Sequence, residues 1–188
     1  MTLLGNGLWA AGRHDDRLAI VEVQLATQRR VGSPEEQVLT TRSNLAHCLY
    51  KLERLEESIA IDREVYAREK KLYGPTDKTT IHAGNSLVTS LNASGQYAEA
   101  KAFAGKLLSK CRRVLGSNHV LTLNSHAGFA EALYGAGASR GDILQAVAIL
   151  EDVARARRRA LGEHHPTTAR ALASLERARM RREDVAAP

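Results

Sequence analysis

The sequence predicts an all-α protein built from a repeated helix-turn-helix unit, and two observations carry this prediction. First, Gly32, Gly74 and Gly116 are spaced 42 residues apart, and Gly162 follows after 46. Second, aromatic residues make up only 4% of the chain while Ala, Leu and Arg dominate, a mixture that favours helices over strands. A recurrence of this length is typical of stacked repeats that share one continuous core.

An apolar stripe after each glycine predicts the first helix of each unit. Leu45, Leu87, Phe129 and Leu175 each stand 13 residues after a glycine, and a leucine follows four residues later in the first three units. Residues four apart share one helical face. We therefore expect first helices at 37–52, 78–93, 120–135 and 166–182.

A second apolar stripe, with Ile61, Phe103 and Ile149 in matching places, predicts the second helices. These are expected at 14–30, 55–72, 97–114 and 142–160. The third unit fits only with four extra residues in the turn 136–141. The predicted divisions are a partial repeat at 1–31 that holds the end of a first helix at Leu4, Leu8 and Gly12, repeats at 32–73, 74–115 and 116–161, a capping helix at 162–182 and a tail at 183–188.

The residues around the turns have structural explanations. A glycine directly after a helix suits the left-handed C-cap conformation, which other residues enter only with strain. Asp77, His119 and His165 come just before the next helix, and His165 is followed by Pro166. A polar residue before a proline is a helix-start pattern, so we expect these three side chains to act as caps.

Composition excludes several classes of protein. The chain has 188 residues, a net charge of +6 and no apolar run near the roughly 20 residues of a membrane span. Its N-terminus lacks the basic and apolar regions of a signal peptide, so we expect a cytoplasmic protein that does not bind membranes. Cys48 and Cys111 are too few for a disulfide framework and are expected to be reduced and buried.

Nothing in the sequence predicts catalysis, a metal or a cofactor. The pair His164-His165 has no Cys, Asp or Glu cluster spaced to complete a metal site. The glycine-rich segment 135–141 lacks the Lys-Ser or Lys-Thr ending of a phosphate-binding loop, so it is interpreted as a loose turn. We expect no enzymatic activity from this chain.

Two segments carry a family resemblance: Leu161-Gly162-Glu163-His164-His165-Pro166-Thr167-Thr168 and Gly95-Gln96-Tyr97-Ala98-Glu99-Ala100. They resemble the 42-residue tetratricopeptide repeat (TPR) of kinesin light chains. The resemblance covers the chain from about Leu4 to Arg179 and implies a right-handed α-solenoid that serves as a scaffold for protein-protein interaction. It also leaves open an alternative, that the chain is a regulatory or sensor segment of a larger multidomain enzyme.

The resemblance further implies that first helices line a concave groove. Positions 8, 11, 15 and 18 after each glycine form one stripe beside the core stripe. This stripe is rich in amides and hydroxyls, which can bind the backbone of an extended peptide, while its two tyrosines offer flat contacts. The candidate groove residues are Thr40, Ser43, His47, Tyr50, His82, Asn85, Thr89, Asn92, Asn124, Glu131 and Tyr134.

A second candidate surface is basic. Lys and Arg recur at the end of each second helix, most densely in the run Arg155 to Arg159. Cations there also complement the helix dipole, which is a structural explanation. The partner expected from the stripe is a protein or peptide. The alternative is that the basic outer surface binds an acidic protein or nucleic acid, although the scarcity of aromatic residues disfavours nucleic acid.

Overall fold

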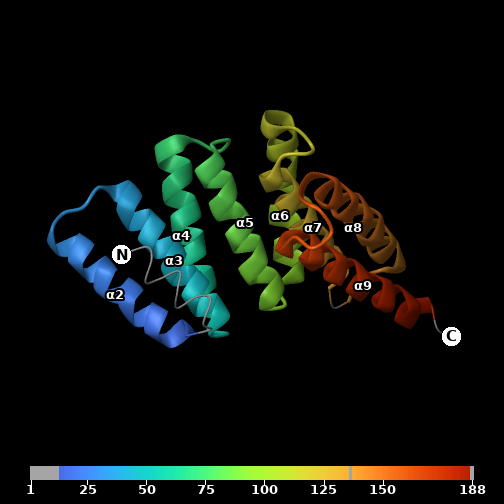
Figure 1. Ribbon diagram of the computed structural model, residues 1–188, viewed down its shortest axis with the longest axis horizontal. Helices are drawn as coiled ribbons and strands as arrows, with labels where there is room; N and C mark the ends of the chain where they lie inside the picture. The colour runs from blue at the N-terminus through green and yellow to red at the C-terminus, as the bar shows by residue number, and fades with distance from the viewer. Residues whose placement is uncertain (1–12, 136, 187–188) are drawn as a thin grey trace. The chain divides into compact units, whose positions relative to one another are not determined.

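The computed structural model describes residues 13–135 and 137–186 (Figure 1). Helices and turns account for this whole part of the chain, and it contains no strand. The chain divides into two compact units, an N-terminal unit of residues 1–90 and a C-terminal unit of residues 91–188. The predicted all-α class is therefore confirmed, and each unit is described by itself.

The N-terminal unit contains α2 (His14–Arg30), α3 (Glu35–Lys51), α4 (Leu55–Tyr73) and most of α5 (Lys78–Ala93). Helix α3 packs against both α2 and α4. The apolar stripes form the interior, with Cys48 and Leu49 of α3 packed against α2. Cys48 is fully buried and its sulfur is a free thiol.

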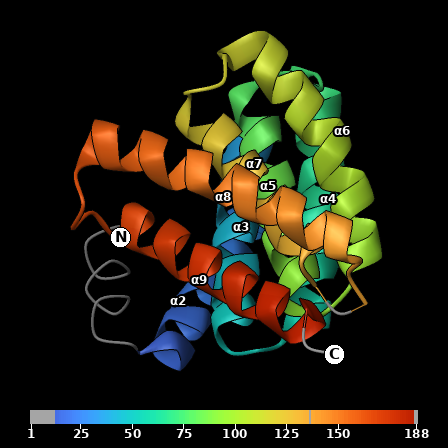
Figure 2. The same cartoon turned by 90° about the vertical axis from the view of Figure 1, so that its right-hand side faces the viewer.

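The C-terminal unit contains the end of α5, α6 (Tyr97–Leu115), α7 (Val120–Leu133), α8 (Arg140–Leu161) and α9 (Pro166–Ala186). Helix α7 packs against α6 and α8, and α9 lies along α8 (Figure 2). Leu133, Leu150 and Leu175 lie in one apolar cluster of this unit. Cys111 is a second free, fully buried thiol.

The three predicted caps are confirmed. Asp77 Oδ1 accepts a hydrogen bond from the Thr79 amide at 2.8 Å. His119 Nδ1 accepts one from the Leu121 amide at 3.2 Å, and His165 Nδ1 accepts one from the Thr167 amide at 3.2 Å. Each acceptor satisfies an amide that has no partner inside its own helix. The histidines of the repeat are thus explained by helix geometry.

The glycines after α4, α6 and α8 differ from the expected left-handed cap. Gly74, Gly116 and Gly162 do have positive φ, between 80° and 89°, but their ψ is 167° or 168°. This combination lies outside the left-handed helical region and is essentially restricted to glycine. The expected φ was right and the expected ψ was wrong, and the requirement for glycine is stricter than predicted.

Four helix ends differ from the prediction by two residues or more. Helix α3 begins at Glu35 rather than 37, and α7 ends at Leu133 rather than 135. Helix α8 begins at Arg140 rather than 142, because Ser139 Oγ accepts a hydrogen bond from the Asp142 amide at 3.1 Å. Helix α9 continues to Ala186 rather than ending at 182, since no glycine or proline interrupts it before the last residue, Pro188. The helix end predicted at Leu4, Leu8 and Gly12 lies outside the described residues.

Candidate functional site

The first-helix stripe of the N-terminal unit presents polar side chains of graded exposure. On α3, Thr40 and His47 are exposed, while Ser43 and Tyr50 are half-buried. On α5, His82 is exposed, and Asn85 and Thr89 are half-buried. The hydroxyls of Thr40 and Thr89 donate to the carbonyls of Glu36 and Asn85, both at 3.0 Å. Their oxygen lone pairs remain able to accept a hydrogen bond.

Two aromatic side chains of the stripe, His47 and Tyr50, lie close together near the end of α3. The rings of His47 and Tyr50 lie with their centroids 6.1 Å apart, tilted by 41°. The ammonium nitrogen of Lys51 lies 5.5 Å from the centroid of the Tyr50 ring, within the range of a cation–π contact. His47 and Tyr50 are thus neighbours on α3, whereas the other tyrosine of the predicted stripe, Tyr134, follows α7.

In the C-terminal unit, Asn124 is held by a buried arginine. Arg157 of α8 is 3% exposed, and its Nη2 donates to Asn124 Oδ1 at 2.7 Å while its Nη1 donates to the Thr167 carbonyl at 2.9 Å. These contacts fix the orientation of the Asn124 amide. Because one lone pair of Oδ1 is occupied by Arg157, the group that half-buried Asn124 chiefly offers to a ligand is the donor Nδ2.

Asn92 is buried, whereas the sequence predicted that its side chain would face the groove. Its Nδ2 donates to the Gly128 carbonyl of α7 at 2.9 Å, and its Oδ1 is enclosed with no protein partner. Only 9% of the residue is exposed. In this conformation the Asn92 amide joins α5 to α7 and does not reach a ligand.

Glu131 lies on α7, which packs against α9, and Tyr134 directly follows the end of α7. Glu131 Oε1 accepts a hydrogen bond from Ser174 Oγ at 2.7 Å and lies 3.9 Å from Arg177 Nη2. Burial, together with the nearby Glu131 charge, raises the pKa of Tyr134 to about 12, so its hydroxyl stays protonated at neutral pH. Tyr134 therefore remains a potential hydrogen-bond donor.

The same register continues into α9, whose residues were not among those predicted for the stripe. Positions 8, 11, 15 and 18 after Gly162 hold Arg170, Ala173, Arg177 and Met180, all exposed. The periodicity that selected the other residues could have found them. Their inclusion adds two arginines, so the stripe of the C-terminal unit is more basic than predicted.

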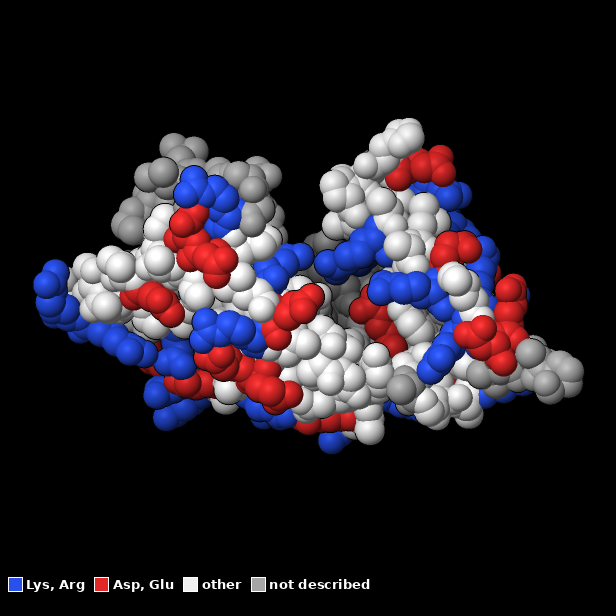
Figure 3. Space-filling view, turned by 90° about the horizontal axis from the view of Figure 1, so that it is seen from below, with Lys and Arg blue, Asp and Glu red and all other residues white. Residues whose placement is uncertain are grey.

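The basic surface is smaller than the sequence suggested, because Arg157 does not belong to it. Its burial against Asn124 and Thr167 removes it from the run Arg155 to Arg159. Of the remaining arginines in that run, Arg155 lies 3.6 Å from Asp152 and Arg158 lies 3.3 Å from Glu163. On the face seen in Figure 3, basic and acidic side chains are interspersed.

Two further properties of the described residues bear on function. None of their helices has the length and apolar character needed to cross a bilayer. No group of three or more His, Cys, Asp or Glu side chains within 13–135 and 137–186 could hold a metal ion.

Paired helices, recurring glycines of fixed conformation and a polar first-helix stripe define a helical-repeat protein. The tetratricopeptide repeat family matches residues 38–77, 80–121 and 138–167. These segments cover more than half of the sequence, and the chain belongs to this family. TPR repeats generally mediate protein-protein interaction.

Solved structures agree on the fold. The nearly identical TPR-like repeats of a Podosopora anserina protein named for kinesin light chain are 21% identical, with a TM-score of 0.72 over 96% of this chain and 84% of that one. A single-residue variant of those repeats gives the same identity and coverage and a TM-score of 0.74. BtubC (BKLC) from P. vanneervenii is 13% identical, with a TM-score of 0.73 over 98% of this chain and 72% of that one. The comparison with curated proteins finds no match.

Proposed function

We propose that this chain is a non-enzymatic scaffold whose first-helix stripe binds an extended or short helical peptide of a protein partner. The observation that carries the proposal is the Asn124 amide, held by buried Arg157 so that its donor group stays available. A donor fixed in advance loses little conformational entropy when it binds a peptide carbonyl.

The remaining stripe residues supply complementary groups. Asn85 is half-buried on α5 and supplies a second amide, while Thr40, Ser43 and Thr89 supply hydroxyl oxygens. His47 and Tyr50 offer contacts for peptide side chains in the N-terminal unit, and Glu131 and Tyr134 offer such contacts in the C-terminal unit. Asn92 is left out of this set because its amide is used within the fold.

The alternative of a basic outer surface is supported less well. The ion pairs of Arg155 and Arg158 lower the net positive charge that an acidic partner would meet. A regulatory role within a larger enzyme is compatible with peptide binding, since a sensor segment also needs a recognition surface. The sequence of the full-length gene distinguishes the two roles, since a regulatory segment requires that the same gene also encodes a catalytic domain.

The proposal is tested with short random peptides displayed on phage and selected against the full chain. The affinity of a selected peptide is then measured for Asn85→Ala/Asn124→Ala and for Arg155→Ala/Arg158→Ala/Arg159→Ala. We expect the asparagine variant to bind about tenfold more weakly or worse, since each amide hydrogen bond contributes about 0.5–1.5 kcal/mol. The arginine variant should bind normally.

Salt provides an independent measurement on the same peptide. Binding through amides should change little between about 50 and about 200 mM salt, whereas binding through the basic surface should weaken steeply. Loss of binding only in the arginine variant, together with steep salt dependence, would overturn the stripe as the binding surface.

A further inference from the structure

A cavity of about 450 Å³ lies in the C-terminal unit, and none of the stripe residues lines it. It is enclosed by the end of α6, the turn at Ser117 and Asn118, the first half of α7 and the second half of α8. Leu123, Ile149, Val153 and Ala156 give it an apolar floor. Its volume falls in the range of roughly 300–1,000 Å³ that is usual for ligand pockets.

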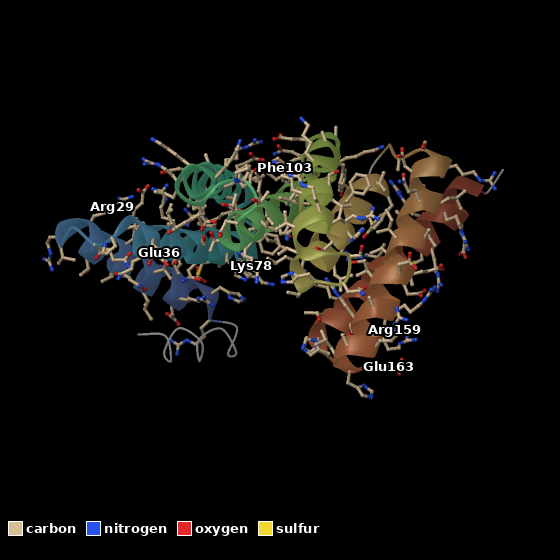
Figure 4. The ribbon with its side chains drawn as sticks, turned by 90° about the horizontal axis from the view of Figure 1, so that it is seen from above. Arg29, Glu36, Lys78, Phe103, Arg159 and Glu163 are labelled. Atoms are coloured by element: carbon tan, nitrogen blue, oxygen red, sulfur yellow. The ribbon has the colours of Figure 1, made fainter. Side chains whose placement is uncertain are left out.

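The rim of this cavity is basic. Arg112 of α6 and Arg155 and Arg159 of α8 contribute three cations, and Asp152 contributes the single carboxylate of the lining. Arg155 already lies 3.6 Å from Asp152. Arg112 and Arg159 are exposed and form no ion pair within the described part of the chain. Figure 4 labels Arg159 in the last turns of α8, near Glu163.

A histidine also lines this cavity. His126 of α7 donates from Nδ1 to the Thr122 carbonyl at 3.1 Å, so the neutral ring presents Nε2 as an acceptor. Among the described residues Nε2 has no partner. Burial lowers the pKa of His126, and Arg112 lowers it further while Asp152 acts in the opposite direction. An anion in the cavity would favour the protonated ring, which turns Nε2 into a donor.

We propose that this cavity binds an acidic side chain of a partner protein, together with an adjacent aliphatic side chain. The carboxylate lies between Arg112 and Arg159 and stays ionised, while His126 takes up a proton from solvent and becomes charged. The aliphatic neighbour covers Leu123 and Ile149. A carboxylate alone would leave this apolar floor uncovered, so the cavity suits two side chains of different character.

The chemistry of the lining disfavours nucleic acid as the occupant. No aromatic side chain other than the His126 imidazole lines the cavity, so it offers no extended platform on which bases could stack. The site also differs from the stripe of the proposed function, because neither Asn85 nor Asn124 lines it. The two proposals therefore fail or survive separately.

The test uses a short fluorescent peptide of alternating Glu and Leu, and the same peptide with Gln in place of Glu. It compares Arg112→Ala/Arg159→Ala with the matched control Arg113→Ala/Arg158→Ala. Both variants lose one cation from α6 and one from α8, and all four arginines are exposed. Arg113 and Arg158 do not line the cavity. Thermal melts establish that both variants remain folded.

We expect Arg112→Ala/Arg159→Ala to weaken binding of the Glu peptide about tenfold or more, as loss of hydrogen bonds to a charged group implies. The control variant should lose less than about threefold, through long-range attraction alone. The Gln peptide should bind as weakly as the Glu peptide binds to the cavity variant. By NMR, the pKa of His126 should rise when the Glu peptide binds, and His126→Gln should remove the strengthening of binding at low pH.

Three results would overturn the proposal. Equal losses in the two arginine variants would indicate diffuse attraction to the basic surface. Equal binding of the Glu and Gln peptides would show that no carboxylate is recognised. Tighter binding of single-stranded poly(U) than of the Glu peptide, lost in the same cavity variant, would assign the site to nucleic acid.

Discussion

The two units bury charges of opposite sign at matching positions of the repeat. Glu69 of α4 and Arg157 of α8 occupy the same register once the four extra residues of the third repeat are allowed for, and Cys111 is their counterpart on α6. Glu69 is 9% exposed and Arg157 is 3% exposed. The fold thus accepts an acid, a thiol or a guanidinium at one position, and the neighbouring groups decide which one is tolerated.

The N-terminal unit adds a second buried acid within a chain of hydroxyls. Ser90 Oγ lies 2.7 Å from Asp62 Oδ2 and 3.1 Å from Ser58 Oγ, which in turn lies 2.9 Å from the Ala46 carbonyl. When Asp62 is ionised, Ser90 donates to it and Ser58 donates to Ala46, which leaves the Ser58–Ser90 contact without a proton; a protonated Asp62 that donates to Ser90 supplies the missing one. Burial raises the pKa of Asp62 to about 6 despite the hydrogen bond from Ser90, in agreement with this count.

In the C-terminal unit, the positions that match Asp62 are apolar, and the buried cation stands at a different position of the repeat. Ala104 and Leu150 occupy the positions that match Asp62, and both are fully buried. Its buried cation, Arg157, reaches Asn124 at the stripe, whereas Asp62 contacts only the interior. A buried ionisable group can therefore support either the core alone, as Asp62 does, or the core and a recognition residue together, as Arg157 does.

Arg157→Ala is expected to change the stability of the protein more than any other substitution considered for these buried groups. The substitution leaves Asn124 Oδ1 and the Thr167 carbonyl without their donor and empties a packed volume. We expect a loss of about 2–4 kcal/mol in the free energy of unfolding, measured by urea denaturation. Exposed Arg158→Ala is the control and should change stability by less than about 0.5 kcal/mol. Equal losses would remove the distinction between the two arginines.

Asp62→Asn should stabilise the protein at neutral pH. Because the folded-state pKa of about 6 exceeds the ordinary 3.8, the stability associated with protonated Asp62 is present below pH 4 and lost as pH rises through 6. Asparagine keeps the third donor at every pH. We expect the substitution to raise the free energy of unfolding by up to about 3 kcal/mol at pH 7.5 and to leave it unchanged at low pH. Urea denaturation at a series of pH values measures this difference. A gain independent of pH would contradict the proton count.

The smallest effect concerns the turn between the paired helices. Glu53 has a φ of 58° in the N-terminal unit, where the matching residues of the C-terminal unit are Gly95 and Gly137 with φ of 78° and 76°. A residue with a Cβ is strained in this conformation. Glu53→Gly should therefore raise stability by about 0.5–1 kcal/mol in thermal melts, while Gly95→Glu should lower it. A destabilised Glu53→Gly variant would show that entropy outweighs the strain.

Local sequence signals predicted most of the fold because they are short-range. Apolar periodicity located the helices, and Asp77, His119 and His165 were recognised as caps from their neighbours alone. The start of α8 could also have been predicted, since Ser139 and Asp142 have the spacing of a capping box. The ψ angle of the glycines could not have been predicted, because glycine is favoured at any positive φ, whatever the value of ψ.

The candidate site was less predictable, since it depends on contacts between helices. Periodicity placed Asn92 and Asn124 on one stripe, but it does not say which way an amide points. That orientation comes from the Gly128 carbonyl in one case and from Arg157 in the other. Arg157 itself stands in a basic run, and only its packing against α9 distinguishes it from its exposed neighbours.

The side-chain amide of Asn124 provides the most direct test of the proposed function. In a ¹⁵N NMR titration with a peptide selected against the full chain, its Nδ2 protons should shift and become protected from solvent exchange. The Asn92 amide, already bonded to Gly128, should not change. A peptide that binds without moving the Asn124 resonance, while the resonances of Arg112 and Arg159 shift, would contradict recognition by the first-helix stripe.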